Sequence, residues 1–253
     1  MKKVLMIAIV VFMSSTVYAG EKLTACGGLA YPPFMWKEGG KIVGVGTEVA
    51  EIIFGELGIQ VESKAFSSWN RCLQEVKKGR TDMLVAATVN KERKAFADFT
   101  KNCLSEVPLA VFVWKDRAFR FEKWEDLIGK KMGGILGSSY GQKFDEFAAK
   151  NLKISEVVTP IQNFKKLEKG RVDFLPVGLY AGLIHVKQFG YADKVAVLKP
   201  YLKTECLYVA MSKKSEYLKH LPYVGRRLLK LHADGTIKRL IDKYIEYYVT
   251  TTE

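Results

Sequence analysis

The chain has 253 residues, of which 48% are hydrophobic and 26% are charged. Such a chain can bury one large core or two modest ones, which excludes a disordered tail, a disulfide-stapled mini-protein and a collagen-like fibre. The formal net charge of +13 makes nucleic acid, an anionic membrane and an anionic solute the partner classes to weigh against the remaining sequence.

The first twenty residues have the order of parts of a secretory signal peptide. Lys2 and Lys3 precede an apolar run at 4–13, and Val17-Tyr18-Ala19 places small side chains at a cleavage site. A membrane anchor would need about 20 apolar residues, which is longer than this run. We therefore expect a signal peptide at residues 1–19, an exported, periplasmic mature protein and no nucleic-acid role.

Export changes how the four cysteines are interpreted. Cys26, Cys72, Cys103 and Cys206 include no CxxC motif and no histidine at metal spacing, so no metal site is predicted. In an oxidising compartment they allow three pairings into two disulfides, and four free buried thiols remain the alternative.

Strand and helix patterns alternate along the chain. Residues 41–46 are expected to be extended, 48–57 helical up to Gly58, and 60–65 a strand. In the second half, 131–136 is predicted as a strand, 140–150 as a helix and 156–160 as a strand. Apolar spacing predicts helices over 223–232 and 236–248.

A short repeat indicates two related units. Lys78-Gly79-Arg80-Thr81-Asp82-Met83-Leu84 returns as Lys169-Gly170-Arg171-Val172-Asp173-Phe174-Leu175, and each copy predicts a helix, a glycine cap and a strand. Apolar segments at 107–114 and 207–211 fall outside the alternation and are expected to cross between the units.

The predicted fold class is therefore α/β with two lobes joined by a hinge of two crossing strands. Lobe 1 is expected to comprise 20–108 and 206–253, and lobe 2 to comprise 109–205. Cys103 and Cys206 stand just before the two crossing segments, which makes them the preferred disulfide pair.

Several motifs occur in a recognisable order: Tyr31-Pro32-Pro33-Phe34, residues 44–58, residues 69–93 with Asn90-Lys91-Glu92-Arg93, Asp98-Phe99, and Leu231-His232-Ala233-Asp234-Gly235-Thr236. Through them the chain resembles the periplasmic solute-binding proteins of the polar amino-acid class of ABC importers (extracellular solute-binding protein family 3), which have the type II periplasmic-binding fold. The resemblance runs from about Leu23 to Tyr248. It implies a monomer without cofactor whose lobes close on a solute and whose closed form is recognised by a membrane permease.

The resemblance assigns an anion-binding role to Arg93. In amino-acid binders an arginine at this position holds the solute carboxylate, and Thr88 matches a position that offers a hydroxyl to the same group. The alternative is a surface ion pair of Arg93 with Glu92 or Asp98.

A loop in the second half matches the family's second-lobe binding loop. Gly137-Ser138-Ser139 lies between a predicted strand and helix, where backbone N–H groups and hydroxyls favour an anionic or polar ligand group. The serines could instead cap their own helix. Tyr140 and Arg71 are further candidates to line the cleft.

Aromatic residues could enclose an apolar or planar part of the solute. Tyr31, Phe34 and Trp36 follow the first strand, and Trp69 opens the next helix. The family places cleft residues at Tyr31 and Trp69, although each ring could equally fill the core.

Two positions depart from the amino-acid binders. A carboxylate expected after Gly44-Val45 is Gly46 here, and the second-lobe aspartate that holds a solute amino group falls on Gly178. Either another acid such as Glu48 substitutes, or the ligand is a carboxylate-bearing solute other than a standard α-amino acid.

A similar exported fold also serves as a sensor module for membrane receptors and in dehydratases acting on cyclic dienyl acids, such as cyclohexadienyl dehydratase. An enzyme would need a general acid in the cleft, for which Glu48 and Glu106 are candidates. The three histidines are scattered and no catalytic triad is evident, so we expect a binding protein with no catalytic residues.

Overall fold

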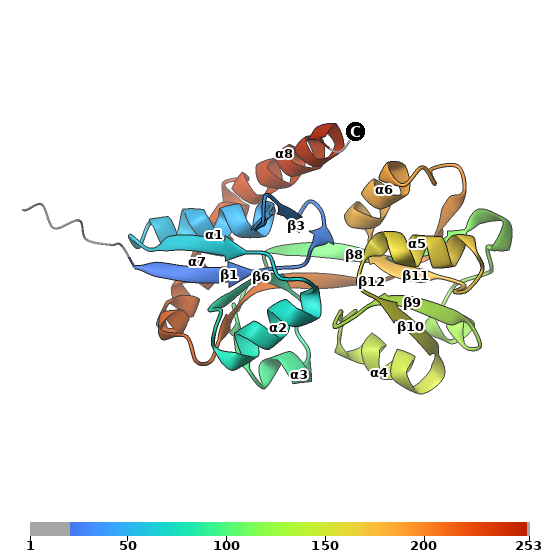
Figure 1. The fold of residues 1–253 in the computed structure, drawn as a ribbon, viewed down its shortest axis with the longest axis horizontal. Helices are drawn as coiled ribbons and strands as arrows, with labels where there is room; N and C mark the ends of the chain where they lie inside the picture. The colour runs from blue at the N-terminus through green and yellow to red at the C-terminus, as the bar shows by residue number, and fades with distance from the viewer. Residues whose placement is uncertain (1–20, 252–253) are drawn as a thin grey trace, which may run out of the picture.

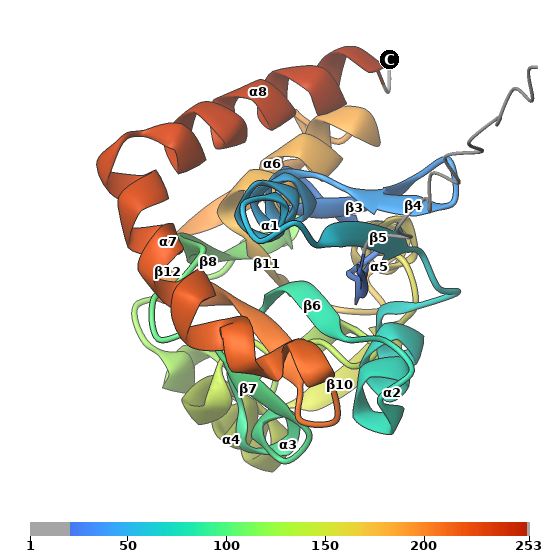
Figure 2. The same ribbon diagram turned by 90° about the vertical axis from the view of Figure 1, so that its left-hand side faces the viewer.

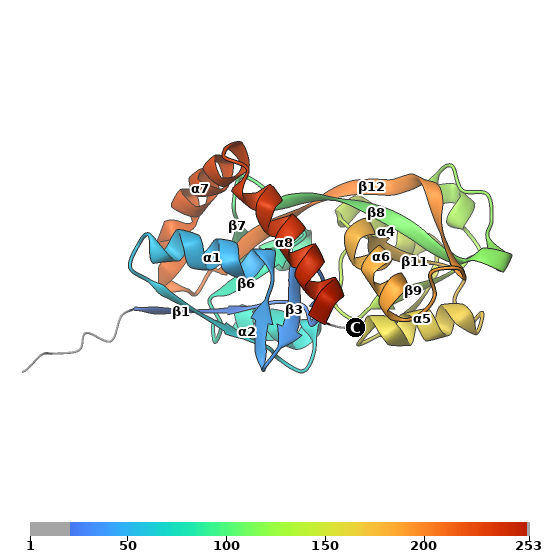
Figure 3. The same cartoon turned by 90° about the horizontal axis from the view of Figure 1, so that it is seen from above.

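The computed structural model describes residues 21–251, and the predicted signal peptide therefore lies outside the described residues. The fold is mixed α/β with two lobes side by side (Figure 1). Strands β8 (Ser105–Trp114) and β12 (Val195–Ser212) run from one lobe into the other, as the view from above also shows (Figure 3). These strands confirm the predicted hinge of two crossing strands.

The first lobe is built on parallel strand pairing. Strand β1 lies between β5 and β6 and is parallel to both, and β12 continues the sheet beyond β6. Its elements are β1 (Lys22–Cys26), β2 (Ala30–Tyr31), β3 (Met35–Glu38), β4 (Lys41–Val43), α1 (Val45–Gly55), β5 (Gln60–Lys64), α2 (Trp69–Lys78), β6 (Met83–Ala87), α3 (Lys91–Lys94) and β7 (Ala97–Phe99).

Three further helical segments follow β12: η3 (Glu216–His220), α7 (Leu221–Ala233) and α8 (Thr236–Thr251). Helices α7 and α8 pack along one side of the first lobe, with α8 against α1 (Figure 2). Leu228, Leu231, Ile237 and Leu240 join the core of this lobe, so helical spacing of apolar residues gives these helices their buried face.

The second lobe has a smaller sheet. Strands β9 and β10 pair in parallel, and β11 joins β8 of the larger sheet. Its elements are η1 (Lys115–Arg117), η2 (Trp124–Leu127), β9 (Lys131–Ile135), α4 (Gln142–Asn151), β10 (Lys153–Val157), α5 (Pro160–Glu168), β11 (Leu175–Gly178) and α6 (Leu179–Gln188).

The sequence repeat forms the same local structure in both lobes. Gly79 ends α2 and Gly170 follows the end of α5, each with positive φ, a conformation in which glycine is unstrained. Asp82 then accepts a hydrogen bond from the backbone N–H of Thr24 in β1, and Asp173 accepts one from the N–H of Lys131 in β9. The repeated aspartate therefore fixes a neighbouring parallel strand in each lobe.

Most predicted elements are confirmed within a few residues, and one is displaced. The strand expected at 156–160 is β10 at Lys153–Val157, because Pro160 occupies the first turn of α5 with Thr159 as its N-cap. The sequence did not predict α6 or the three-stranded sheet of β2, β3 and β4.

The preferred cysteine pairing is not the disulfide that the structure contains. The disulfide joins Cys26, at the end of β1, to Cys72 on the buried face of α2. Cys103 and Cys206 are free thiols whose Sγ atoms lie 2.7 Å apart. Cys103 and Cys206 lie together beside the crossing strands, as predicted, and β1 and α2 are neighbours as well.

Within residues 21–251, no helix combines the length and the apolar character needed to cross a membrane.

Candidate functional site

A cavity of about 260 Å³ lies between the lobes. Residues of the first lobe, the second lobe and the two crossing strands line it, and most of them are apolar. Small-molecule pockets are typically about 300–1,000 Å³, so this cavity suits a small ligand.

Arg93 is the cationic residue of the cavity lining. Asn90 caps the short helix α3 and thereby positions Arg93, which is 3% exposed. Its Nη1 donates to the carbonyl oxygen and the hydroxyl of Thr88 (2.8 and 2.7 Å), and its Nη2 donates to the carbonyl of Gly137 (2.9 Å). Within the described residues no carboxylate lies within ion-pair distance of Arg93, so the alternative of a surface pair with Glu92 or Asp98 does not occur.

Burial lowers the pKa of Arg93 to about 10, which still leaves the guanidinium charged at neutral pH. The Cζ atom of the Arg93 guanidinium lies 5.3 Å from the centroid of the Trp69 ring. Three of its five N–H donors have partners within the described residues, so two remain for a ligand. A buried cation without an anionic partner is costly, and a bound anion would offset that cost.

The lobes are in direct contact around this cavity. Trp69 Nε1 donates to Gly137 O (3.0 Å), and the Thr88 hydroxyl donates to Ser139 O (3.2 Å). Because these bonds join the first lobe to the loop after β9, the structure has the two lobes closed.

The loop at 137–141 lines the cavity through Ser138, Ser139 and Tyr140, and several of its polar groups are already bonded within the second lobe. Asp145 accepts from the Ser139 hydroxyl and from the Tyr140 N–H, and the Ser138 N–H donates to Ile135 O. The expectation that this loop offers free N–H groups is therefore wrong for Ser138, whereas Tyr140 lines the cavity as predicted. Helix α4 begins at Gln142, two residues later than predicted.

Tyr31 lines the cavity and lies against Gly178. A β-carbon on residue 178 would collide with the Tyr31 hydroxyl, which therefore occupies the space of the missing side chain. Burial, with smaller contributions from Tyr140 and Glu205, raises the pKa of Tyr31, so the hydroxyl keeps its proton. Burial likewise raises the pKa of Tyr140.

Polar atoms without hydrogen bonds gather at this cavity. Three atoms of lining residues are buried without a hydrogen-bond partner among the described residues: Thr159 Oγ1, Asn163 Oδ1 and His185 Nδ1. Folded proteins leave few such atoms, so their concentration here indicates a site that a ligand or water completes.

His185 connects the lobes from α6. Its Nε2 lies 3.2 Å from Ala30 O, and because a carbonyl only accepts, Nε2 carries the proton of this bond. Burial lowers the pKa of His185 to about 4, so the ring is neutral at pH 7 and Nδ1 is an acceptor.

Three predicted site residues do not reach the cavity. Phe34 is fully buried in the first-lobe core, and Trp36 packs against Tyr244 and Tyr248 of α8. Arg71 is exposed and pairs with Glu75 (2.8 Å) on its own helix. Phe34 and Trp36 are thus core rings, and the i,i+4 spacing on α2 directs Arg71 toward Glu75.

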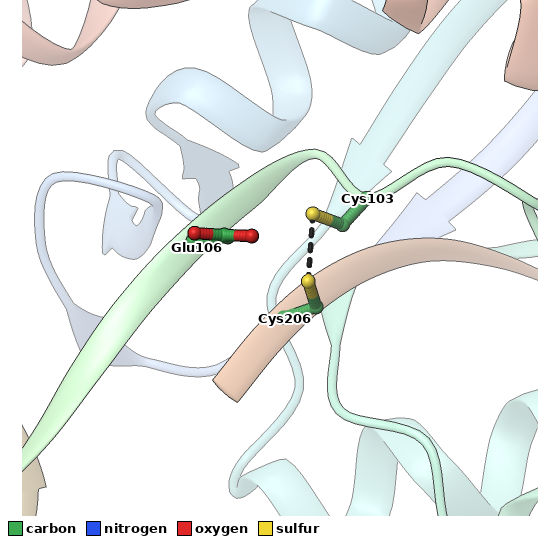
Figure 4. A group of neighbouring side chains, drawn as sticks. All are labelled: Cys103, Glu106 and Cys206. Atoms are coloured by element: carbon green, nitrogen blue, oxygen red, sulfur yellow. Dashed lines mark hydrogen bonds between the residues drawn. The ribbon is translucent and has the colours of Figure 1, made fainter. Parts of the chain in front are cut away.

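Neither acid considered from sequence lines the cavity. Glu48 accepts from Lys243 and Tyr244 of α8, and Glu106 lies beside Cys103 and Cys206 (Figure 4). The acid that does line it is Glu205, which the sequence analysis missed along with Asn163, Thr159 and His185. The one sequence signal for Glu205 is strand alternation: it lies two residues before Leu207, which begins the predicted crossing segment at 207–211, and residues two apart on a strand share a face.

Comparison with known proteins agrees with this architecture. The family model "Bacterial extracellular solute-binding proteins, family 3" matches residues 23–247, and the chain belongs to this family. Its fold is accordingly the two-lobed type II periplasmic-binding fold.

Individual relatives are named as amino-acid binders. The "Probable amino-acid-binding protein YxeM" of Bacillus subtilis (strain 168) is 26% identical over 223 residues, 87% of this chain and 83% of that protein. A solved ancestral arginine-binding protein bound to glutamine is 28% identical, with a TM-score of 0.72 over 88% of this chain and 97% of its own. The substrate-binding protein AbpA from Streptococcus pneumoniae Canada MDR_19A, bound to L-arginine, has a TM-score of 0.74 and 23% identity over 90% of this chain and 96% of its own.

Proposed function

We propose that this protein is exported to the periplasm and captures a small carboxylate-bearing solute, an amino acid or a related acid, between its lobes. The observation that carries the proposal is Arg93, a buried cation that lines the cavity without a carboxylate partner among the described residues. A guanidinium matches a carboxylate with paired donors, and a dry cavity strengthens their attraction.

Delivery to the permease of an ABC importer in the inner membrane is part of the same proposal, with the protein acting as a monomer. The family's extracellular solute-binding description supports it, as does the closed arrangement in which Trp69 and Thr88 bond to the opposite lobe. We propose capture rather than catalysis, because neither Glu48 nor Glu106 reaches the cavity and Glu205, the acid that does line it, is held in an ion pair with Lys203. Turnover of a cyclic dienyl acid by the purified protein would contradict this.

The test is ligand binding by calorimetry after a thermal-shift screen of amino acids, dicarboxylates and other small anions. Arg93→Ala is expected to weaken binding of the best ligand by about 2–5 kcal/mol, since it removes the partner of a buried anion. Arg71→Ala is the matched control, because this arginine is exposed and outside the cavity. Equal affinities of the two variants would remove Arg93 from the site.

A further inference from the structure

The cavity lacks a carboxylate where relatives of this class would hold a solute amino group. Residue 178 is glycine, and the Tyr31 hydroxyl fills the space beside it. An aspartate could not be accommodated there without moving Tyr31. If the solute carries a cationic nitrogen, its partner must project from another element.

Strand register places Glu205 on the same face of the sheet as residue 178. Gly178 of β11 is paired with Leu109 of β8, and Val107, two residues earlier on β8, is paired with Glu205 of β12. Directly paired residues and residues two apart point to the same face of a sheet. Glu205 therefore lies on the same face as residue 178, two strands away, and its side chain is longer than that of aspartate.

The surroundings of Glu205 leave it able to accept a ligand. Its Oε2 forms an ion pair with Lys203 Nζ at 2.5 Å, and an ionised carboxylate has further lone pairs for a second donor. The side chain is 16% exposed and lies against Gly141, where a β-carbon would collide with it. Lys203 is paired with Leu109 and so lies on the same face as Glu205, but it is not among the residues that line the cavity.

Within the described residues, the lining contains one cationic side chain, Arg93, and one anionic side chain, Glu205. We propose that Glu205 takes the role of the absent carboxylate at residue 178 and binds the cationic nitrogen of a zwitterionic solute whose carboxylate lies on Arg93. This inference rests on the proposed function.

The experiment compares Glu205→Gln with wild type against the twenty L-amino acids and their 2-hydroxy acid counterparts, in which a hydroxyl replaces the ammonium. For the amino acid that wild type binds best, Glu205→Gln is expected to bind at least about 20-fold more weakly, with little change for the hydroxy acid. Glu106→Gln is the matched control, because Glu106 adjoins Val107 on β8 but points to the opposite face. If Glu205→Gln alone has a lowered melting temperature, the double variant Lys203→Gln, Glu205→Gln removes both charges and tests for the same loss of amino-acid binding.

The outcomes separate the two proposals. Undiminished amino-acid binding by both Glu205 variants would overturn the role of Glu205 and leave the proposed function standing. Tighter binding of hydroxy acids than of amino acids by wild type would overturn the zwitterionic ligand. Failure of wild type to bind any member of the panel would overturn this inference and the proposed function together.

A second inference rests on a separate contact at the hinge. Cys103 precedes β8, Cys206 lies in β12, and Leu104 N donates to Leu207 O between them, which holds the two thiols in contact (Figure 4). We infer that oxidised glutathione converts them to a disulfide: the two thiols lose two protons and two electrons, and the reagent becomes two glutathione thiols. Burial raises the pKa of Cys103 to about 12, so the reaction should be faster at pH 9 than at pH 7.

Peptide mapping without reduction tests this inference. A linked Cys103–Cys206 peptide lacking two hydrogens is the expected product, and Cys206→Ser should abolish it. Free thiols at both positions after oxidation at pH 9, or glutathione attached to Cys103 without the cross-link, would overturn the inference.

Discussion

The two lobes contain the same strand-fixing aspartate but differ where the following strand meets the cavity. In the first lobe β6 leads to Thr88 and Arg93, which line the cavity with a hydroxyl and a charge. In the second lobe β11 ends at Gly178 and passes directly into α6. The repeat therefore specifies the framework of each lobe, and the residues at the carboxyl ends of the strands specify the chemistry.

A second difference is that, within residues 21–251, the disulfide belongs to the first lobe alone. Replacing Cys26 and Cys72 with alanine is expected to lower the free energy of unfolding by about 4 kcal/mol, because the bond closes a segment of 46 residues. Chemical denaturation without reductant measures this, with the Cys103→Ala, Cys206→Ala variant, which keeps the Cys26–Cys72 bond, as the control. An equal loss in the control would show that the difference between the lobes does not lie in this bond.

The repeated aspartate allows a direct comparison of the lobes. Asp82 accepts from Thr24 N, Thr24 Oγ1 and Ser215 Oγ, whereas the side chain of Asp173 accepts from Lys131 N. Asp82→Ala should therefore cost about 3 kcal/mol and Asp173→Ala about 1 kcal/mol of unfolding free energy. Equal costs would mean that the two copies contribute equally despite their different numbers of partners.

The contact between lobes through His185 should depend on pH. Its pKa is about 4 in the folded protein against 6.5 ordinarily, so the unfolded chain binds more protons between these values. The free energy of unfolding should fall by about 2–3 kcal/mol as the pH falls from 7 to 4.5. His185→Gln should remove this dependence of the unfolding free energy on pH, whereas His220→Gln should retain it. An identical pH dependence in both variants would exclude His185 as the cause.

Local patterns predicted much of the fold. Strands β5 and β9 and helices α1, α7 and α8 follow from alternation, helical spacing and glycine caps, which depend on neighbouring residues. Helix α6 carries apolar residues on more than one side, since α6 packs toward β8 and toward α8, and its periodicity is correspondingly weak. Strand β10 ends before the predicted strand at 156–160 does, because Thr159 and Pro160 begin helix α5.

The site was predicted in part, through motifs that match the family. Arg93, Thr88, Tyr31, Trp69, Ser138, Ser139 and Tyr140 follow motifs in sequence and do line the cavity. Phe34 and Arg71 do not, because a ring or a charge near a motif can point to the core or to solvent. Glu205 has no local signal, since its position depends on pairing across β8.

The sequence by itself determined the two-lobed α/β framework, because alternation, helical spacing and glycine caps act locally, and its resemblance to a family pointed to the arginine of the cavity. The tertiary structure decided which cysteines bond, which aromatic rings enter the core, and which carboxylate lines the cavity. Those outcomes depend on contacts between residues far apart in the chain, such as Cys26 with Cys72 and Glu205 with Val107.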